Sequence, residues 1–124
     1  MFIRKILVVD DEQDICDFVK NFFQERGYDV LTASNGDEAL AAVKINRPEL
    51  VLLDIKMKGM DGIATLRHLK DIDRDIKVIM VTALADQDKM DEACRLGACE
   101  YITKPLALDH LEQTVERNLK EIKV

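Results

Sequence analysis

Three short runs of almost uninterrupted apolar residues, beginning at Ile6, Leu50 and Val78, constrain the fold of this chain most strongly. A strand with one covered face alternates apolar and polar residues, whereas a strand of a parallel sheet is covered on both faces and is apolar throughout. We therefore predict that these runs are parallel strands, and that two segments of more mixed composition join them. The five predicted strands are 5–9, 28–32, 50–53, 77–81 and 99–102.

Amphipathic helical patterns separate the predicted strands. In each pattern, apolar residues recur three or four positions apart and so share one side of a helix. Asn35, with Glu38 three residues later, predicts an N-terminal cap, and Gly97 predicts the end of the helix before it. The predicted apolar stripes are Ile15, Phe18, Val19 and Phe22; Leu40 and Val43; Ile63, Leu66 and Leu69; Met90, Ala93 and Cys94; and Leu108, Leu111, Val115, Leu119 and Ile122.

The strict alternation of strand and helix predicts an α/β fold with a doubly wound parallel sheet. Helices then cover both faces of the sheet, and each crossover is right-handed. A length of 124 residues fits one domain, so we expect residues 1–124 to form a single domain. The hydrophobic content of 48% is enough to build a core on both sides of the sheet.

Charge and hydropathy exclude two classes of partner. The formal net charge is −6 and no basic stripe is present, which argues against direct nucleic-acid binding. No apolar run approaches the roughly 18 residues that a membrane helix needs. The apolar stretch near the start is too short for a signal peptide and runs into Asp10 and Asp11. We therefore expect a cytoplasmic protein that does not bind membranes.

The three cysteines, Cys16, Cys94 and Cys99, are odd in number and lack Cys-x-x-Cys spacing. This argues against a disulfide framework and against a zinc site. We interpret all three as small apolar core residues. The two histidines, His68 and His110, fall on predicted helices without a second ligand at metal spacing, and we expect both on the surface.

Polar residues gather where the predicted strands end. Asp10 and Asp11 follow the first run, Asp54 follows the third, Thr82 follows the fourth and Lys104 follows the fifth. In an open parallel sheet, the carboxyl ends of the strands share one edge, and ligands bind outside that edge where the strand order reverses. We therefore predict that these side chains form one small site.

The chemistry of this predicted site follows from its charge. Three carboxylates in one pocket repel one another unless a cation joins them, and a compact site of oxygen ligands favours Mg²⁺. A carboxylate can attack phosphorus to give an aspartyl phosphate. Asp54 stands alone at a central strand end and is the best nucleophile, whereas Asp10 and Asp11 fit better as metal ligands. Lys104 and Thr82 can then contact phosphoryl oxygens.

Each of these residues also has an ordinary structural explanation. Asp10 and Asp11 could favour the start of the next helix, and Asp54 could be a turn residue. Thr82 could be selected for β-branching, and Lys104 could be a solvated lysine. Only their occurrence together at successive strand ends points to a phosphoacceptor site.

The sequence resembles the response-regulator receiver domains of two-component signalling, the family that includes the chemotaxis regulator CheY. The resemblance covers essentially the whole chain and is carried by four segments. These are ILVVDDE (6–12), DIKMKGMDG (54–62), VTA (81–83) and YITKP (101–105). It implies a five-stranded, three-layer sandwich of the flavodoxin and CheY type, with strand order 2-1-3-4-5.

The resemblance also implies roles for individual residues. Asp54 would be phosphorylated by a sensor histidine kinase or a phosphotransfer protein, which makes the chain a signalling phosphoacceptor rather than an enzyme. Asp11, Asp54 and the backbone carbonyl of Lys56 would hold Mg²⁺, with Asp10 assisting. The Lys104–Pro105 bond would be cis, the rarer form of an X–Pro bond.

A switch and an output surface are implied as well. Thr82 and Tyr101 would carry the conformational change after phosphorylation. The helix around residues 90–96, the strand with Tyr101 and the last helix would then contact a target protein, an output domain or a second copy of the chain.

One position departs from the family pattern. The family usually has proline four residues after the phosphorylated aspartate, and this chain has Lys58. Proline would fix φ and stiffen that loop, whereas lysine leaves it freer and adds a positive charge. The departure bears on the rigidity of the loop and on the lifetime of the phosphoryl group.

Three alternative functions can be weighed from the residues. A binding module with the same fold but no phosphorylation would lack one of the acids, the lysine or the hydroxyl, and all are present. A flavin-binding protein would need a phosphate cradle after the first strand, where this chain has Asp10, Asp11 and Glu12. A phosphatase of the Asp-x-Asp type would need a second aspartate where Lys56 stands.

Overall fold

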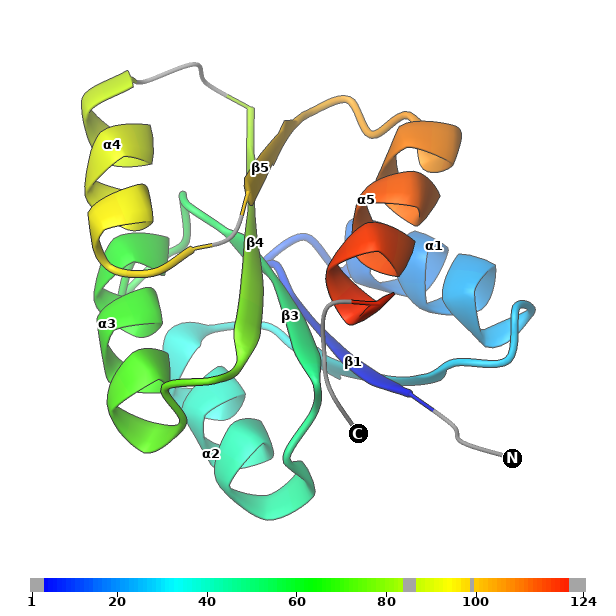
Figure 1. The fold of residues 1–124 in the computed structure, drawn as a ribbon, viewed down its shortest axis with the longest axis horizontal. Helices are drawn as coiled ribbons and strands as arrows, with labels where there is room; N and C mark the ends of the chain where they lie inside the picture. The colour runs from blue at the N-terminus through cyan, green and yellow to red at the C-terminus, as the bar shows by residue number, and fades with distance from the viewer. Residues whose placement is uncertain (1–3, 84–86, 99, 121–124) are drawn as a thin grey trace.

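A computed structural model describes residues 4–83, 87–98 and 100–120 of the chain. Strands and helices alternate along the whole of it, as predicted (Figure 1). The elements are β1 (Lys5–Val9), α1 (Gln13–Gln24), β2 (Asp29–Ala33), α2 (Gly36–Asn46), β3 (Leu50–Asp54), α3 (Gly62–Ile72), β4 (Lys77–Thr82), α4 (Gln87–Arg95), β5 (Glu100–Thr103) and α5 (Leu108–Lys120).

The predicted strand boundaries are accurate to about one residue. β2 lies one position later than predicted, and β3 and β4 extend to include Asp54 and Thr82 themselves. β5 extends to Thr103, and Cys99, the predicted first residue of this strand, lies outside the described residues.

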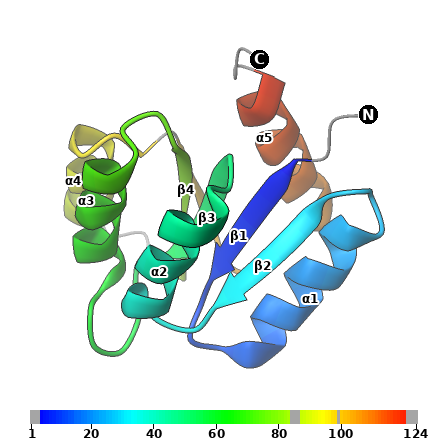
Figure 2. The same ribbon diagram turned by 90° about the horizontal axis from the view of Figure 1, so that it is seen from below.

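All strand pairs are parallel, and the sheet order is β2-β1-β3-β4-β5, which confirms the predicted doubly wound fold. Helices α1 and α5 lie on one face of the sheet, and α2, α3 and α4 lie on the other (Figures 1 and 2). The connection from β1 to β2 runs in one direction along the sheet, and the connections from β2 onwards run in the other. Because these crossovers are right-handed, α1 lies on one face and α2, α3 and α4 lie on the other, which gives three layers. β3 is the central strand.

The continuous apolar runs are explained by burial on both faces of the sheet. In β3, Val51 and Leu53 belong to the core beneath α2, α3 and α4. Leu50 and Leu52, which point the opposite way, belong to the core beneath α1 and α5. Since successive side chains of a strand alternate between faces, covering both faces requires every position to be apolar.

Two helical stripes differ from the prediction. In α1, Phe18 is 52% exposed, whereas Cys16, Val19 and Phe23 are buried. Each helical residue advances by about 100°, so Cys16 and Phe23 lie within about 60° of Val19, while Phe18 lies about 100° away. The buried face of α1 is therefore centred on Val19. The predicted stripe, which included Phe18, lies to one side of that face.

Cys94 is also exposed, so its assignment to the core was wrong. The nine-residue helix α4 buries only Met90 and Ala93, and Cys94 falls outside that narrow stripe. Cys16 is buried as predicted, and Cys99 lies outside the described residues.

The remaining helix predictions agree with the structure where it is described. The Asn35 side chain caps α2 by accepting a hydrogen bond from the Glu38 amide, and Gly97 follows the end of α4 with a φ of 100°. Both histidines are exposed. The predicted stripe residues that are buried are Val43, Ile63, Leu66, Leu69, Leu111, Val115 and Leu119; Leu40 and Leu108 are partly buried, and Ile122 lies outside the described residues.

Among the described residues, no helix combines the length and the apolar composition needed to cross a bilayer.

Gly62 allows α3 to begin directly against the end of β3. Its amide donates a hydrogen bond to the Ile55 carbonyl at 2.9 Å. A Cβ atom at this position would meet the Asp54 carbonyl oxygen at 2.2 Å and the Ile55 Cα at 2.6 Å. Any side chain here would therefore displace the backbone that carries Asp54.

We expect Gly62→Ala to lower the free energy of unfolding by about 1–3 kcal/mol, the usual cost of overpacking a close contact. Gly27→Ala is the matched comparison, because Gly27 has a φ of 89° but nothing lies within 4 Å of its would-be Cβ. That change introduces only the strain of a left-handed backbone at a residue with a side chain, which should lower the free energy of unfolding by about 1–2 kcal/mol. Urea denaturation measures both. Equal stability of G62A and the parent would contradict the steric argument.

Candidate functional site

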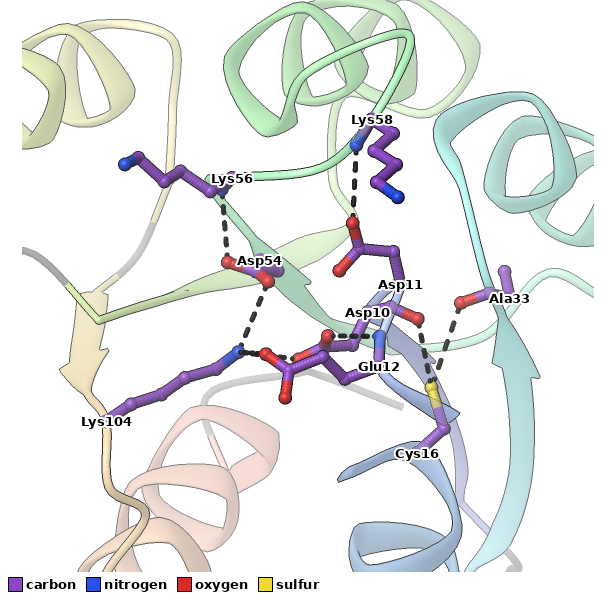
Figure 3. Close-up of polar contacts among 9 residues, drawn as sticks. All are labelled: Asp10, Asp11, Glu12, Cys16, Ala33, Asp54, Lys56, Lys58 and Lys104. Atoms are coloured by element: carbon purple, nitrogen blue, oxygen red, sulfur yellow. Dashed lines mark hydrogen bonds and ion pairs between the residues drawn. The ribbon is translucent and has the colours of Figure 1, made fainter. Parts of the chain in front are cut away.

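Four of the predicted polar residues, Asp10, Asp11, Asp54 and Lys104, meet at the carboxyl edge of the sheet (Figure 3). Asp10 follows β1, Asp54 ends β3, Thr82 ends β4 and Lys104 follows β5. Asp10, Asp54 and Thr82 are buried, and Lys104 is partly buried. The structure therefore brings the side chains of Asp10, Asp54 and Lys104 together, and it places Thr82 at the end of the neighbouring strand β4.

The Lys104 ammonium group lies among three carboxylates. Its Nζ is 2.9 Å from Asp10 Oδ2, 3.2 Å from Asp54 Oδ2 and 3.6 Å from Glu12 Oε1. Asp10 and Asp54 are almost inaccessible to water, so the shared cation offsets their mutual repulsion. Charged groups buried this deeply stay ionised only when they are paired and hydrogen-bonded.

Backbone amides orient the same two carboxylates. The Glu12 amide donates to Asp10 Oδ1 at 2.9 Å, and the Lys56 amide donates to Asp54 Oδ1 at 3.1 Å. Lys104 is positioned through its own amide, which donates to the Thr82 carbonyl at 2.7 Å. The Lys104–Pro105 bond is cis, as the resemblance implies.

Asp11 lies at the entrance to the site. It is exposed, and its Oδ2 accepts a hydrogen bond from the Lys58 amide at 3.4 Å. The carboxylates of Asp10, Asp11 and Glu12 offer oxygens within 4.8 Å of one another. An open hollow of about 350 Å³ adjoins Asp11; it is lined by Asp11, Ile55, Lys56, Met57, Lys58, Asp61 and Lys89.

The buried position of Asp54 controls its ionisation. Burial raises the pKa of the Asp54 carboxyl, the nearby charge of Asp10 raises it further, and Lys104 with the Lys56 amide opposes this rise. Burial would lower the pKa of Lys104, but its hydrogen bonds and charge interactions with Asp10 and Asp54 outweigh burial and raise it. Of the two partners, Lys104 is held in its charged form, whereas the folded protein disfavours the charge on Asp54.

The donor set fits a hard divalent cation. Asp10, Asp11 and Glu12 offer carboxylate oxygens close to one another, and Asp54 shares the Lys104 ammonium group with Asp10. Carboxylate oxygens are the ligands that Mg²⁺ prefers. The raised pKa of Asp54 points the same way, because a second positive charge would stabilise its ionised form.

Tyr101 is not part of this group of side chains. It lies in β5, where it pairs with Met80 of β4, and it is 45% exposed. Thr82 pairs with Thr103, two positions further along the same ladder. The two residues expected to act as a switch therefore lie on adjacent strands.

Sequence reasoning missed two contributors to the site. Glu12 approaches Lys104, and Cys16 donates from its Sγ to the Asp10 carbonyl at 3.3 Å. Burial, with the nearby charge of Asp10, raises the pKa of the Cys16 thiol to about 11, so it stays a neutral donor. The run Asp10-Asp11-Glu12 was a signal for Glu12, whereas Cys16 is indistinguishable in sequence from any core cysteine.

Comparison with known proteins decides the family. The family model described as the response regulator receiver domain matches residues 6–116. The chain is a receiver domain. Members of this family are phosphoacceptor switches of two-component signalling, they are phosphorylated on an aspartate, and they bind Mg²⁺ at an acidic pocket.

Curated relatives agree with this assignment. The receiver domain is 41% identical over 119 residues to sporulation initiation phosphotransferase F of Bacillus subtilis, with 96% of each chain covered. It is 40% identical over 114 residues to the transcriptional regulatory protein ZraR of Salmonella typhimurium. That match covers 92% of this chain and 26% of ZraR, so this chain spans about a quarter of the longer relative.

Solved structures show the same fold. The receiver domain of NtrX from Brucella abortus superimposes with a TM-score of 0.89 at 38% identity, covering 94% of this chain and 99% of the other. A two-component response regulator from Clostridium difficile gives a TM-score of 0.93 at 26% identity, covering 98% and 99%.

The pKa of Asp54 yields a test that needs no phosphodonor. Because this pKa is higher in the folded protein than in the unfolded chain, the charge on Asp54 destabilises the fold at neutral pH. We therefore expect Asp54→Asn to raise the free energy of unfolding at pH 7 in Mg²⁺-free buffer. The gain should shrink as the pH falls and vanish below about pH 3, where the carboxyl is protonated in both states.

Urea denaturation at several pH values measures this dependence. Asp29→Asn, at an exposed position in β2, is the control and should change stability by less than about 0.5 kcal/mol. A less stable D54N protein at pH 7 would show that the ionised carboxylate is favoured by its surroundings.

Proposed function

We propose that this receiver domain accepts its phosphoryl group on Asp54. The observation that supports the proposal is the position of this carboxylate. It ends the central strand, it is buried, and Lys104 Nζ lies 3.2 Å from its Oδ2. Asp10 is the other buried carboxylate of the site and makes the same two kinds of contact, with Lys104 and with a backbone amide, but it follows β1 and does not end the central strand.

In the proposed reaction, a carboxylate oxygen of Asp54 attacks the phosphorus of the donor. The bond between phosphorus and the donor's leaving atom breaks, and its electron pair leaves with the donor. Lys104 would move from the carboxylate towards a phosphoryl oxygen and keep its charge. The Thr82 hydroxyl would donate to another oxygen of the same group.

Asp11, Asp54 and the backbone carbonyl of Lys56 are the proposed Mg²⁺ ligands, with Asp10 assisting. Bound there, Mg²⁺ would neutralise negative charge on the transferred group. Asp11 and Lys56 also line the open hollow beside the site, so an ion or a donor can reach them from solvent.

The proposed donor is a sensor histidine kinase or a phosphotransfer protein, as is usual for this family. The longer relatives, such as ZraR, carry a receiver domain in about a quarter of their length. We propose that the target of this domain is either an attached output domain, a separate protein or a second copy. Lys58, exposed at the rim of the hollow, is proposed to leave the β3–α3 loop more mobile than a proline would.

Asp54→Asn should abolish labelling by acetyl phosphate in the presence of Mg²⁺, because the attacking oxygen is replaced by an amide. Intact-mass spectrometry detects the added phosphoryl group. The Asp29→Asn protein is the control and should be labelled like the parent. Labelling of D54N to the parent level would place the acceptor elsewhere.

Mg²⁺ affinity should respond in opposite ways to Asp11→Asn and Lys104→Met. Loss of the Asp11 charge should weaken binding about tenfold or more, since it removes a direct ligand. Loss of Lys104 should leave binding intact or tighten it, because a competing cation is gone. Isothermal titration calorimetry measures both constants. An unchanged affinity in D11N would rule out Asp11 as a ligand.

The proposed switch begins when phosphoryl oxygens form beside Thr82. Movement of Thr82 towards them would vacate space near α4, and Tyr101 would turn inward to fill it. The Tyr101 side chain is 45% exposed, so an inward turn would bury surface that is now in contact with solvent. The surface formed by α4, β5 and α5 would then change shape, as a shift between two packings of similar energy.

Beryllofluoride with Mg²⁺ mimics the phosphoryl group and should shift backbone NMR signals well beyond the site. We expect changes in α4, around Tyr101 and in α5, because the two packings differ there. D54N should show no such changes. Shifts limited to Asp10, Asp11, Asp54 and their loops would contradict this switch.

A further inference from the structure

A second hollow, of about 380 Å³, opens where the end of α3, the following loop and the end of α4 meet. It carries four positive charges and one negative charge, although the chain as a whole has a net charge of −6. Helices α3 and α4 lie side by side on the same face of the sheet (Figures 1 and 2). We call it the α3–α4 hollow; its lining residues are Arg67, Lys70, Asp71, Arg74, Arg95 and Leu96.

Lys70 is fixed within this hollow. Its Nζ donates to the Ile76 carbonyl at 2.6 Å and to the Arg74 carbonyl at 3.5 Å. Its stem lies so close to the turn after α4 that a Cβ at Gly97 would meet Lys70 Cε at 3.1 Å. Lys70 therefore ties the loop after α3 to the end of α4, and its role is structural.

The three arginines are not used in this way. Arg67, Arg74 and Arg95 are all exposed, and none forms a side-chain hydrogen bond or ion pair within the part of the chain that the structure describes. Cations near a helix C-terminus offset the partial negative charge of its last carbonyls, which accounts for Arg95 at the end of α4. It does not account for Arg67 in the middle of α3, or for Arg74 beyond its end.

Guanidinium groups bind carboxylates and phosphates through paired hydrogen bonds. The three groups come from α3, from the loop and from α4, around a hollow that is open to solvent and too large for a single ion. Among the residues that the structure describes, no aromatic side chain lines it, so they offer no surface for stacking a base. The net charge of −6 repels a long polyanion such as nucleic acid, whereas a short acidic segment interacts mainly with charges within about 8 Å.

We propose that the α3–α4 hollow docks a short, acidic, carboxylate-bearing segment of a partner protein. The hollow precedes β4, at the amino end of the strands, whereas Asp54 lies at their carboxyl edge. Docking is therefore spatially separate from the phosphoacceptor site, and the two can be tested independently.

The test is an NMR titration of the full chain with an acetylated, amidated hexaglutamate peptide. We expect chemical-shift changes at residues 67–76 and 95–97, and an affinity that falls as salt is added. The matched hexaglutamine peptide should cause no such changes. The double variant Arg67→Gln/Arg95→Gln should bind hexaglutamate about three- to tenfold more weakly, since exposed charge pairs contribute modestly.

Arg47→Gln is the control variant, because Arg47 is an exposed arginine at the end of α2, away from the hollow. It should bind hexaglutamate like the parent. Labelling by acetyl phosphate should be unchanged in all variants, which also shows that they are folded. Equal affinity in the double variant, or shifts confined to other surfaces, would overturn the proposal. Tighter binding of inorganic tripolyphosphate than of hexaglutamate at the hollow would also overturn it, in favour of a phosphate site.

Discussion

The contact of Lys104 with Asp10 and Asp54 is the interaction on which the arrangement of the site depends. Two buried carboxylates at neighbouring strand ends repel each other, and the ammonium group between them holds them together. Amides from Glu12 and Lys56 satisfy the opposite oxygens. The pKa of Asp54 is nevertheless raised, so these contacts only partly offset the cost of its negative charge. An additional cation at the same place would therefore be favourable. The structural ion pair and the proposed metal and phosphoryl chemistry thus rest on the same charges.

The fold places these charges with little freedom. Asp54 and Thr82 end strands that are buried on both faces, Asp10 directly follows another such strand, and Lys104 is held by its amide to the end of β4. Gly62 brings α3 against the backbone of Asp54 and Ile55, so the two ends of the loop between β3 and α3 are closely packed. The rim differs: Asp11, Lys56 and Lys58 are exposed. A site with buried, fixed residues at its base and exposed residues around its opening can admit a large donor and still position the acceptor.

Charge is distributed unevenly over the molecule. At the carboxyl edge of the sheet, Asp10, Asp11 and Glu12 lie beside Lys104, and Lys56, Lys58 and Lys89 line the adjoining hollow. The α3–α4 hollow, at the other end of the strands, gathers arginines in an acidic chain. Because electrostatic attraction at physiological salt acts over about 8 Å, a segment docked at the α3–α4 hollow would respond mainly to the charges around that hollow.

The sequence by itself determined the fold class and most of the site. Apolar runs identified strands covered on both faces, and parallel strands must bring Asp10, Asp54, Thr82 and Lys104 to one edge. The strand order and the cis Lys104–Pro105 bond came from the family resemblance. The tertiary structure decided which helix residues are buried: Phe18 and Cys94 fit an apolar stripe, yet the direction in which α1 and α4 meet the sheet leaves both exposed. It also decided the contacts of Cys16 with the Asp10 carbonyl and of Lys70 with the turn after α4. The periodicity of a segment determines which of its residues share one side of a helix or strand. The angle at which that element packs, and so which side is buried, depends on all the elements of the fold together.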